Sequence, residues 1–172
     1  MSDARMAGDY LTAHYSREKG ESIVYGAVLA AGALIMFGLP RAPLISLVLA
    51  LAAAAIALYH WPYVARERRA VAITPAGIMV ERLGLLPWNA ISDVRLFERY
   101  VRMIRNAELR ISLRRPLASA VENAPSVSLA GRYMYRCWSI VSPQEIAIKL
   151  STLDAKPETV EAAIRQHLHR PV

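Results

Sequence analysis

Arginine side chains are the residues of this sequence best suited to bind a charged ligand. Arg99, Arg102 and Arg105 recur at every third position, and Arg132 and Arg136 flank two tyrosines in "RYMYRCW". A guanidinium group matches the planar, bidentate geometry of phosphate and carboxylate groups. If these stretches face a bilayer, arginine would contact anionic headgroups while the interleaved aromatic side chains lie at the interface. The alternative interpretation is a solvated basic face.

Motifs for catalysis or metal binding are absent from the sequence. It has no glycine-rich phosphate loop, no H-E-x-x-H pattern and no spaced cluster of cysteine and histidine. Cys137 is the single cysteine, so we expect no disulfide within the chain and a buried or half-buried thiol. His167 and His169 stand at the end of an expected helix, where we expect solvated side chains. We therefore predict a non-enzymatic protein that holds no metal and no cofactor.

The positive charge of the chain is concentrated in its C-terminal part. The net charge is +7, and residues 62–172 hold 17 basic and 10 acidic side chains. A basic surface attracts anionic partners. Nucleic acid is a poor candidate, because no recognised nucleic-acid-binding motif is present and a domain beside a membrane has little access to it. Anionic lipid headgroups fit better.

Two uncharged apolar segments precede this basic part. They are "IVYGAVLAAGALIMFGL" (23–39) and "LISLVLALAAAAIALYHW" (44–61), and two prolines bracket the short turn between them. At about 1.5 Å per helical residue, each segment spans roughly 26 Å, close to the ~30 Å hydrocarbon core of a bilayer. Neither segment has the polar stripe of a helix in a soluble protein. The sequence therefore predicts a transmembrane helical hairpin at residues 23–61.

Basic residues near the two segments predict their orientation. Three basic residues precede the first segment, one lies in the turn, and Arg66, Arg68 and Arg69 follow the second. Lys and Arg are enriched on the cytoplasmic side of membrane helices. We therefore expect a two-pass protein of a bacterial inner membrane, surrounded by lipid, with both termini cytoplasmic. Residues 1–22 would be a cytoplasmic N-terminal segment.

Aromatic side chains gather where the second segment ends. Tyr59, His60, Trp61 and Tyr63 have the composition of an aromatic belt at a membrane–water interface. His60 is therefore interpreted as an interfacial residue and not as a ligand to a metal.

Small residues in both segments permit close contact between helices. Gly26 and Ala30 have the small-xxx-small spacing that lets two helix backbones approach. Two interpretations stay open: packing between the two segments, and docking of one face onto a membrane-protein partner or a second copy of the chain. The candidate packing residues are Gly26, Ala30, Gly32 and Ala54, together with the similarly spaced pair Ala27 and Ala31.

The residues after the hairpin alternate as short β-strands do. Turn sequences such as "TPAG" separate them. We expect strands at 70–74, 78–83, 92–97, 108–115, 132–140 and 145–153, and a short strand at "PW" (87–88) to which "GLL" leads. Residues 100–107 are ambiguous between a helix and an irregular hairpin, and residues 115–131 are expected to be a long loop.

The end of the chain predicts a helix. "KPETVEAAIRQHL" has proline at the first helical position, acidic residues in the first turn and one apolar stripe. We expect this helix at residues 157–169, on a cytoplasmic β domain of residues 62–172.

The order of these features resembles the bacterial pleckstrin-homology-like membrane proteins, including the group called YcxB-like. The family's "PW-x-x-I-x-x-V" segment matches Pro87, Trp88, Ile91 and Val94. The resemblance implies an α+β membrane protein: a two-helix hairpin followed by a partly open, roughly seven-stranded β-barrel that the C-terminal helix caps. It does not explain residues 115–138.

Trp88 begins the segment that carries this resemblance. We expect Trp88, Ile91 and Val94 to be structural core residues, with the indole as a buried plug; exposure of the indole at the membrane interface is the alternative.

A compact domain without recognisable chemistry, behind a membrane hairpin, predicts an accessory, scaffold or assembly subunit of a membrane protein complex. The alternative function is a sensor of anionic lipid headgroups that uses the arginine stretches. A third hypothesis is an enzyme whose site forms only with a partner.

Overall fold

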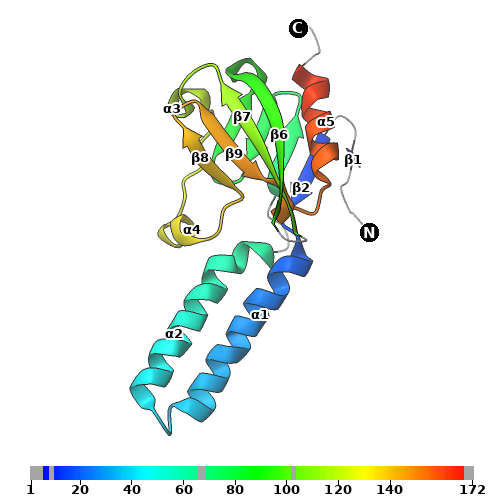
Figure 1. Ribbon diagram of the computed structural model, residues 1–172. Helices are drawn as coiled ribbons and strands as arrows, with labels where there is room; N and C mark the ends of the chain where they lie inside the picture. The colour runs from blue at the N-terminus through cyan, green and yellow to red at the C-terminus, as the bar shows by residue number, and fades with distance from the viewer. Residues whose placement is uncertain (1–5, 8–9, 66–68, 102–103, 169–172) are drawn as a thin grey trace. The chain divides into compact units, whose positions relative to one another are not determined.

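The computed structural model describes residues 6–7, 10–65, 69–101 and 104–168 (Figure 1). The chain divides into two compact units. The first, here called the β domain, comprises residues 1–15, 67–127 and 136–172. The second, here called the helical unit, comprises residues 16–66 and 128–135. The helical hairpin is therefore an insertion into the sequence of the β domain.

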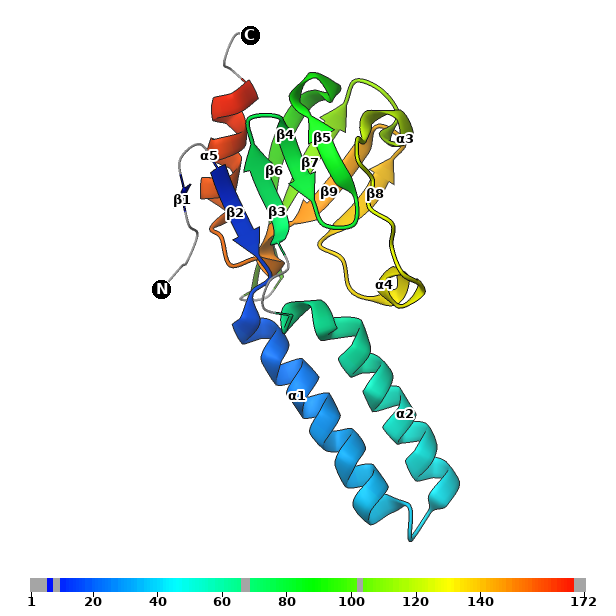
Figure 2. The ribbon, with the colours of Figure 1, turned by 180° about the vertical axis from the view of Figure 1, so that it is seen from behind.

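Two antiparallel sheets form the β domain (Figure 2). Within the described residues, one sheet has the strand order β1-β2-β3-β4-β5 and the other has the order β6-β7-β9-β8. The strands are β1 (Met6–Ala7), β2 (Tyr10–His14), β3 (Arg69–Thr74), β4 (Gly77–Val80), β5 (Gly84–Pro87), β6 (Ile91–Val101), β7 (Ile104–Leu113), β8 (Trp138–Ser142) and β9 (Glu145–Lys149). The α+β architecture, with two apolar helices and a C-terminal helix, is confirmed.

Strand β2 precedes the hairpin in the sequence, yet it pairs with β3, which follows the hairpin. Leu11 lies opposite Ile73, and Ala13 lies opposite Val71. Leu11 and Ala13 are buried, as alternate residues of a half-buried strand should be. The prediction of a separate N-terminal segment at residues 1–22 therefore differs from the structure, in which residues 10–14 belong to the first sheet.

The loop after β2 is tied to the C-terminal part of the β domain. The backbone N–H of His14 donates to Asp154 Oδ1 at 2.8 Å, and the N–H of Asp154 donates to the His14 carbonyl at 3.0 Å. Tyr15 forms an isolated bridge with Leu153. These bonds hold the C-terminal end of β2.

Aliphatic side chains of both sheets form the core of the β domain. Helix α5 (Pro157–Leu168) packs on β6 and β7 and buries Val160 and Ile164, so the predicted C-terminal helix is confirmed. The largest fully buried side chains of the domain are Val71, Ile73, Ile78, Leu86, Ile91, Leu109, Ile111, Ile146, Ile148, Leu150 and Ile164.

Residues 100–107 form a hairpin and not a helix, apart from residues 102–103, which lie outside the described residues. Strands β6 and β7 pair from Ile91 opposite Leu113 to Val101 opposite Ile104. Tyr100, Val101 and Ile104 of this segment are aromatic or β-branched types that favour strands, which agrees with the outcome.

The prediction of one strand at residues 132–140 is wrong. Helix α4 (Leu129–Tyr133) comes first, and β8 begins only at Trp138. Ser128 caps α4, because its hydroxyl accepts a hydrogen bond from the Gly131 N–H at 3.2 Å. A second short helix, α3 (Leu117–Ala120), interrupts the expected loop at residues 115–131. The predicted strand at 145–153 ends at Lys149, where the turn η4 (Leu150–Thr152) follows.

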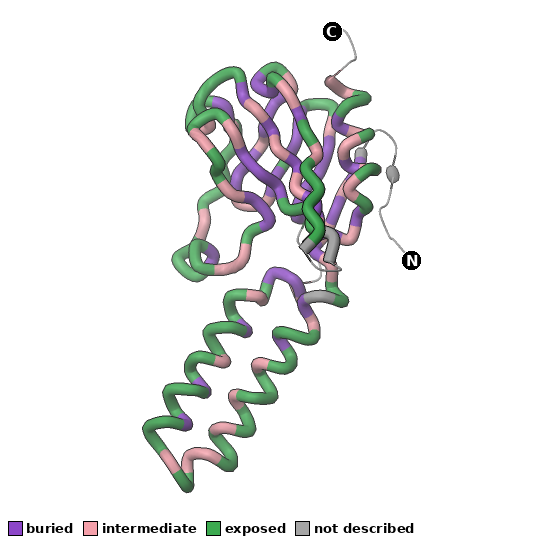
Figure 3. The backbone as a smooth tube through the Cα atoms, viewed as in Figure 1, coloured by how far each residue is buried: buried purple, intermediate pink, exposed green. Residues whose placement is uncertain are grey.

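Two long apolar helices make up most of the helical unit. Helix α1 (Arg17–Ala33) continues through the π-helical turn η1 (Leu34–Gly38), and α2 (Pro43–His60) continues through the 3-10 turn η2 (Trp61–Tyr63). Both helices are long and apolar enough to cross a membrane. Most of their residues are exposed, as the green colour of Figure 3 shows.

The contact face between α1 and α2 differs from the predicted one. Gly20 lies directly against the Tyr63 side chain, and Gly38 lies directly against Ser46. The buried residues along the rest of the contact include Val24, Ala50 and Ala57. Gly26, Ala30, Gly32 and Ala54, the predicted packing residues, are exposed instead. Gly20 and Gly38 therefore lie at the contact between the helices, whereas these four small residues lie outside it.

Candidate functional site

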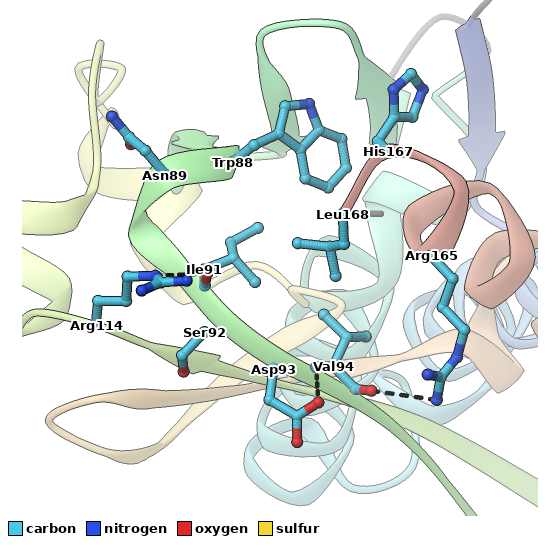
Figure 4. A pocket seen from close by; sticks show the side chains of 10 residues that line it. All are labelled: Trp88, Asn89, Ile91, Ser92, Asp93, Val94, Arg114, Arg165, His167 and Leu168. Carbon is cyan, nitrogen blue, oxygen red and sulfur yellow. Dashed lines mark hydrogen bonds between the residues drawn. The ribbon is translucent and has the colours of Figure 1, made fainter. Parts of the chain in front are cut away.

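A groove of about 400 Å³ in the β domain brings several polar side chains together (Figure 4). It lies where the turn η3 (Trp88–Ala90) enters β6, beside the last turn of α5. Its lining residues are Trp88, Asn89, Ile91, Ser92, Asp93, Val94, Arg114, Arg165, His167 and Leu168. This groove is the candidate binding site of the β domain.

Trp88 forms one wall of the groove and is half-buried. Its indole N–H donates to the Thr74 carbonyl at 3.0 Å, and its ring stacks on His167 with a centroid distance of 5.1 Å. The indole that was predicted as a buried plug is therefore only half-buried. The last residue of the 3-10 turn, Ala90, and the next residue, Ile91, are buried, which leaves the indole at the edge of the core.

The other two predicted core residues of the same segment, Ile91 and Val94, are buried. Their side chains face the domain interior, whereas Ser92 between them is exposed. A β-bulge between Ile91 and Asp93 accommodates the extra residue. The bulge places the polar residues of early β6 in the groove.

Two guanidinium groups approach the backbone of β6 inside the groove. Arg114 Nε donates to the Ile91 carbonyl at 3.2 Å. Arg165 donates to the Val94 carbonyl at 3.5 Å and forms a closer ion pair with Glu161 at 2.8 Å. The edge of β6 is therefore partly covered by charged side chains, which hinders its pairing with a strand of another protein.

Asp93 supplies a carboxylate to the same groove. Its Oδ2 accepts a hydrogen bond from Arg95 Nε at 2.7 Å, and its Oδ1 accepts one from the Val94 N–H at 2.8 Å. The hydrogen bond from Arg95, and then the one from Val94, hold the pKa of Asp93 below its usual value. An ionised carboxylate of this kind is a binding group and a poor proton carrier near neutral pH.

The arginine stretch at residues 99–105 does not form one basic face. Arg99 is exposed and lies opposite Asn106, whereas Tyr100 lies opposite Arg105. Positions 99 and 105 therefore belong to opposite faces of the β6–β7 hairpin. Arg102 lies outside the described residues, as does the side chain of Arg105. A three-residue spacing aligns side chains in a helix, but not in a strand.

Arg132 and Arg136 belong to different units of the protein. Arg132 is exposed in the last turn of α4, within the helical unit. Arg136 belongs to the β domain, where its guanidinium lies over the Trp138 ring, 4.5 Å from the centroid. The segment "RYMYRCW" therefore runs from the helical unit into the β domain.

An aromatic cluster stands at the C-terminal end of α2. The Tyr135 ring lies 5.0 Å from Tyr63, 6.0 Å from Tyr59 and 6.4 Å from His60, centroid to centroid. The Tyr135 N–H donates to the Tyr59 carbonyl at 2.8 Å. His60 Nδ1 lies 3.0 Å from the Ile56 carbonyl. The sequence predicted the aromatic group on α2, but not its partner from residues 128–135.

A second buried cluster surrounds Cys137 in the β domain. Cys137 is fully buried, and its Sγ lies 3.9 Å from the Ala70 carbonyl. Burial raises the pKa of the Cys137 thiol to about 11, although a hydrogen bond with Tyr15 opposes the shift. Burial also raises the pKa of Tyr15. The thiol is therefore protonated and inert at neutral pH, which suits a structural role.

The described residues contain no group of three His, Cys, Asp or Glu side chains that could hold a metal ion. Comparison of the chain with protein-family models, with curated proteins and with solved structures gives no match.

Proposed function

We propose that this protein is a membrane-anchored accessory or scaffold subunit, whose β domain and outward helix face bind a partner in a membrane complex. The observation that carries the proposal is the pairing of β2 with β3 on either side of an apolar hairpin. Only Tyr15 and Ser16 separate β2 from α1. A hairpin connected to two neighbouring strands of one sheet would tether the β domain to the bilayer through two chain segments.

The exposed apolar surface of α1 and α2 supports a double crossing of the membrane. Large exposed apolar patches on a protein are sites of contact with lipid or with other proteins. Because β2 and β3 are neighbours in one sheet, both outer ends of the hairpin would lie on one side of the bilayer. The basic residues near these ends favour the cytoplasmic side of a bacterial inner membrane.

The fold supports the inferred kinship with pleckstrin-homology-like domains. Two antiparallel sheets and a C-terminal helix are the elements that such a partly open barrel requires. We infer this kinship from the "PW-x-x-I-x-x-V" segment and from the order of the elements.

Two surfaces are available for a partner. The exposed small residues Gly26 and Ala30, one helical turn apart, would let a helix of a second membrane protein, or of a second copy of the chain, approach α1 closely. In the β domain, the groove beside Trp88 offers two guanidinium groups and an aromatic wall to an acidic segment of a partner.

Co-purification tests the scaffold proposal. The full-length tagged chain is extracted from native membranes in a mild detergent, and bound proteins are identified. We expect a stoichiometric partner to co-purify with the unmodified chain and to be lost with Gly26→Leu. Nothing lies within 4 Å of a Cβ placed at Gly26, so the hairpin itself should tolerate this substitution. Val28→Leu, at an exposed position of the same helix, is the control. A chain that always elutes alone and monomeric would refute the proposal.

Binding of anionic lipid is the second candidate function, supported by the exposed side chains of Arg99 and Arg132. The full chain is placed in nanodiscs of mixed neutral and anionic lipid, and the lipids retained after extraction are quantified. Enrichment of anionic lipid that Arg132→Gln lowers at low salt would favour this function. Equal retention by both proteins at every salt concentration would exclude Arg132 as the binding group.

A further inference from the structure

We propose that residues 128–135, centred on α4, form an interfacial anchor that takes the acyl chain of a phospholipid in a groove between α4 and α2. This inference rests on the proposed membrane crossing of α1 and α2. It adds a third membrane contact, contributed by a segment that lies almost seventy residues after the hairpin.

Segment 128–135 is fixed to the end of α2 by several contacts. The Tyr135 N–H donates to the Tyr59 carbonyl, and the Tyr135 ring packs on Tyr59 and Tyr63. The helix itself is short, but its start is capped by Ser128, and Gly131 is buried within the unit. Residues 128–135 are therefore an ordered part of the helical unit, fixed to α2 by these contacts.

The groove between the two helices has a volume of about 400 Å³. Its lining residues are Ala55, Ile56, Leu58, Tyr59, His60, Ala130 and Tyr133. Apart from His60 and the two tyrosine hydroxyl groups, these side chains are apolar. A hydrocarbon chain matches such a lining, whereas a polar ligand would find few partners.

The groove is continuous with the face of α2 that would contact lipid. Ile56 and Leu58 line the groove and also belong to the exposed apolar surface of that helix. The last turn of α2 carries Tyr59, and the following turn η2 begins with Trp61; both are residue types of the membrane–water interface. Lipid around α2 is therefore the nearest source of an occupant for the groove.

The outer side of α4 has the composition of an interfacial helix. Leu129 is 75% exposed and Tyr133 is 79% exposed. Arg132 is exposed between them, where its guanidinium would meet a lipid phosphate. Burying Leu129 in the acyl boundary, with the tyrosine ring at headgroup level, removes both apolar surfaces from water.

Depth measurements with single fluorescent labels test the anchor. Leu129→Cys is made in a Cys137→Ala background, labelled with an environment-sensitive dye and reconstituted in vesicles of phospholipid alone. Leu51→Cys, on the exposed surface of α2, is the deep reference, and Ser119→Cys, exposed in the β domain, is the aqueous reference. We expect the label at 129 to be quenched by a nitroxide near the headgroup and protected from aqueous iodide.

The same labels separate failure of the anchor from failure of the crossing. Iodide that quenches the label at 129 as strongly as the label at 119, while the label at 51 stays protected, would overturn the anchor alone. Iodide that also reaches the label at 51 would overturn the crossing and the anchor together. Protection of the label at 129 in native membranes, but not in pure lipid, would assign segment 128–135 to a protein partner and overturn the lipid proposal.

Photocrosslinking tests the acyl-chain groove. A phospholipid with a diazirine near the end of its acyl chain is irradiated with the full chain in vesicles, and the modified peptides are mapped. Ala130→Trp places a large ring in the groove, so we expect crosslinking to peptides containing residues 55–60 and 128–135 to fall several-fold. Ala118→Trp, on the exposed surface of α3, should leave it unchanged. Equal crosslinking in both variants would overturn the groove assignment.

Discussion

Leu11 lies opposite Ile73 across an antiparallel strand pair, although the whole helical hairpin separates the two residues in the sequence. Both side chains are buried in the core of the β domain. The pairing makes the residues before the hairpin part of the same sheet as the residues after it. The β domain is therefore discontinuous in sequence and continuous in structure.

We predict that Leu11→Ala destabilises the β domain by about 2–4 kcal/mol, because it leaves a cavity beside Ile73 in a closed core. Thr12→Ala, at the neighbouring half-buried position, should cost well under half as much. Guanidinium unfolding of the full chain in detergent, followed by tryptophan fluorescence, measures both values. Equal effects of the two substitutions would argue against the β2–β3 register.

We predict opposite effects for alanine at two glycines of the hairpin. Gly38→Ala should lower stability by about 1–3 kcal/mol, because the added Cβ would meet the Ser46 side chain. Gly32→Ala meets no atom within 4 Å and should raise stability by up to about 1 kcal/mol through helix propensity. Unfolding of the purified chain with a rising fraction of SDS in mixed micelles measures the two changes. If Gly32→Ala lowered stability more than Gly38→Ala, the assignment of Gly38 to the contact between the two helices would be wrong.

We predict that Trp88→Ala destabilises the β domain by about 2–3 kcal/mol, less than a fully buried tryptophan would cost. The substitution removes the stack on His167 and the hydrogen bond to the Thr74 carbonyl. Trp88→Phe keeps a ring and loses the hydrogen bond, so it should cost about 1 kcal/mol. Urea unfolding monitored by far-ultraviolet circular dichroism gives both values. A Trp88→Phe variant as unstable as Trp88→Ala would contradict the role of the stack.

We predict that the β domain loses stability at alkaline pH through Cys137. Burial raises the pKa of this thiol to about 11, while an unfolded thiol ionises near pH ~8.5. Above pH ~8.5 the unfolded chain therefore binds fewer protons than the folded chain, and the free energy of unfolding falls as pH rises. We expect Cys137 to contribute a fall of about 2 kcal/mol by pH 10.

The control for this pH effect is Cys137→Ala. Denaturant unfolding of both proteins between pH 7 and pH 10 compares the slopes of stability against pH. Removal of the thiol should make the slope shallower, while the buried Tyr15 hydroxyl, whose pKa is also raised, still contributes at the highest pH values. Identical slopes would show that the thiol is not buried in a protonated state.

The elements with the strongest periodicity were predicted from the sequence. The two apolar segments, the amphipathic helix α5 and the strands around the "TPAG" turn each carry a pattern that one structure alone satisfies. Strand β2 was not predicted, because "YLTAH" is short and its partner strand lies beyond the hairpin in the sequence. Its alternation of Leu11 and Ala13 was a usable signal, but a weak one.

The site was predicted less well than the fold. Trp88, Ile91 and Val94 were predicted as core residues. The 3-10 turn that places the indole at the edge of the core could not be recognised from the residue types of this segment. The basic residues that reach the groove, Arg114 and Arg165, come from β7's end and α5, and only the tertiary fold unites them. The alternation in "RYMYRCW" suggested a strand, whereas capping by Ser128 favours a helical turn.

The insertion of the hairpin between β2 and β3 constrains the order in which the protein is made. The ribosome releases β2 first, and its neighbour β3 emerges only after both apolar helices have been synthesised. Leu11 and Ala13 consequently remain without their sheet until α1 and α2 have been synthesised. Pairing of β2 with β3 is thus a late event, since no nascent chain that ends before the hairpin is complete contains both strands.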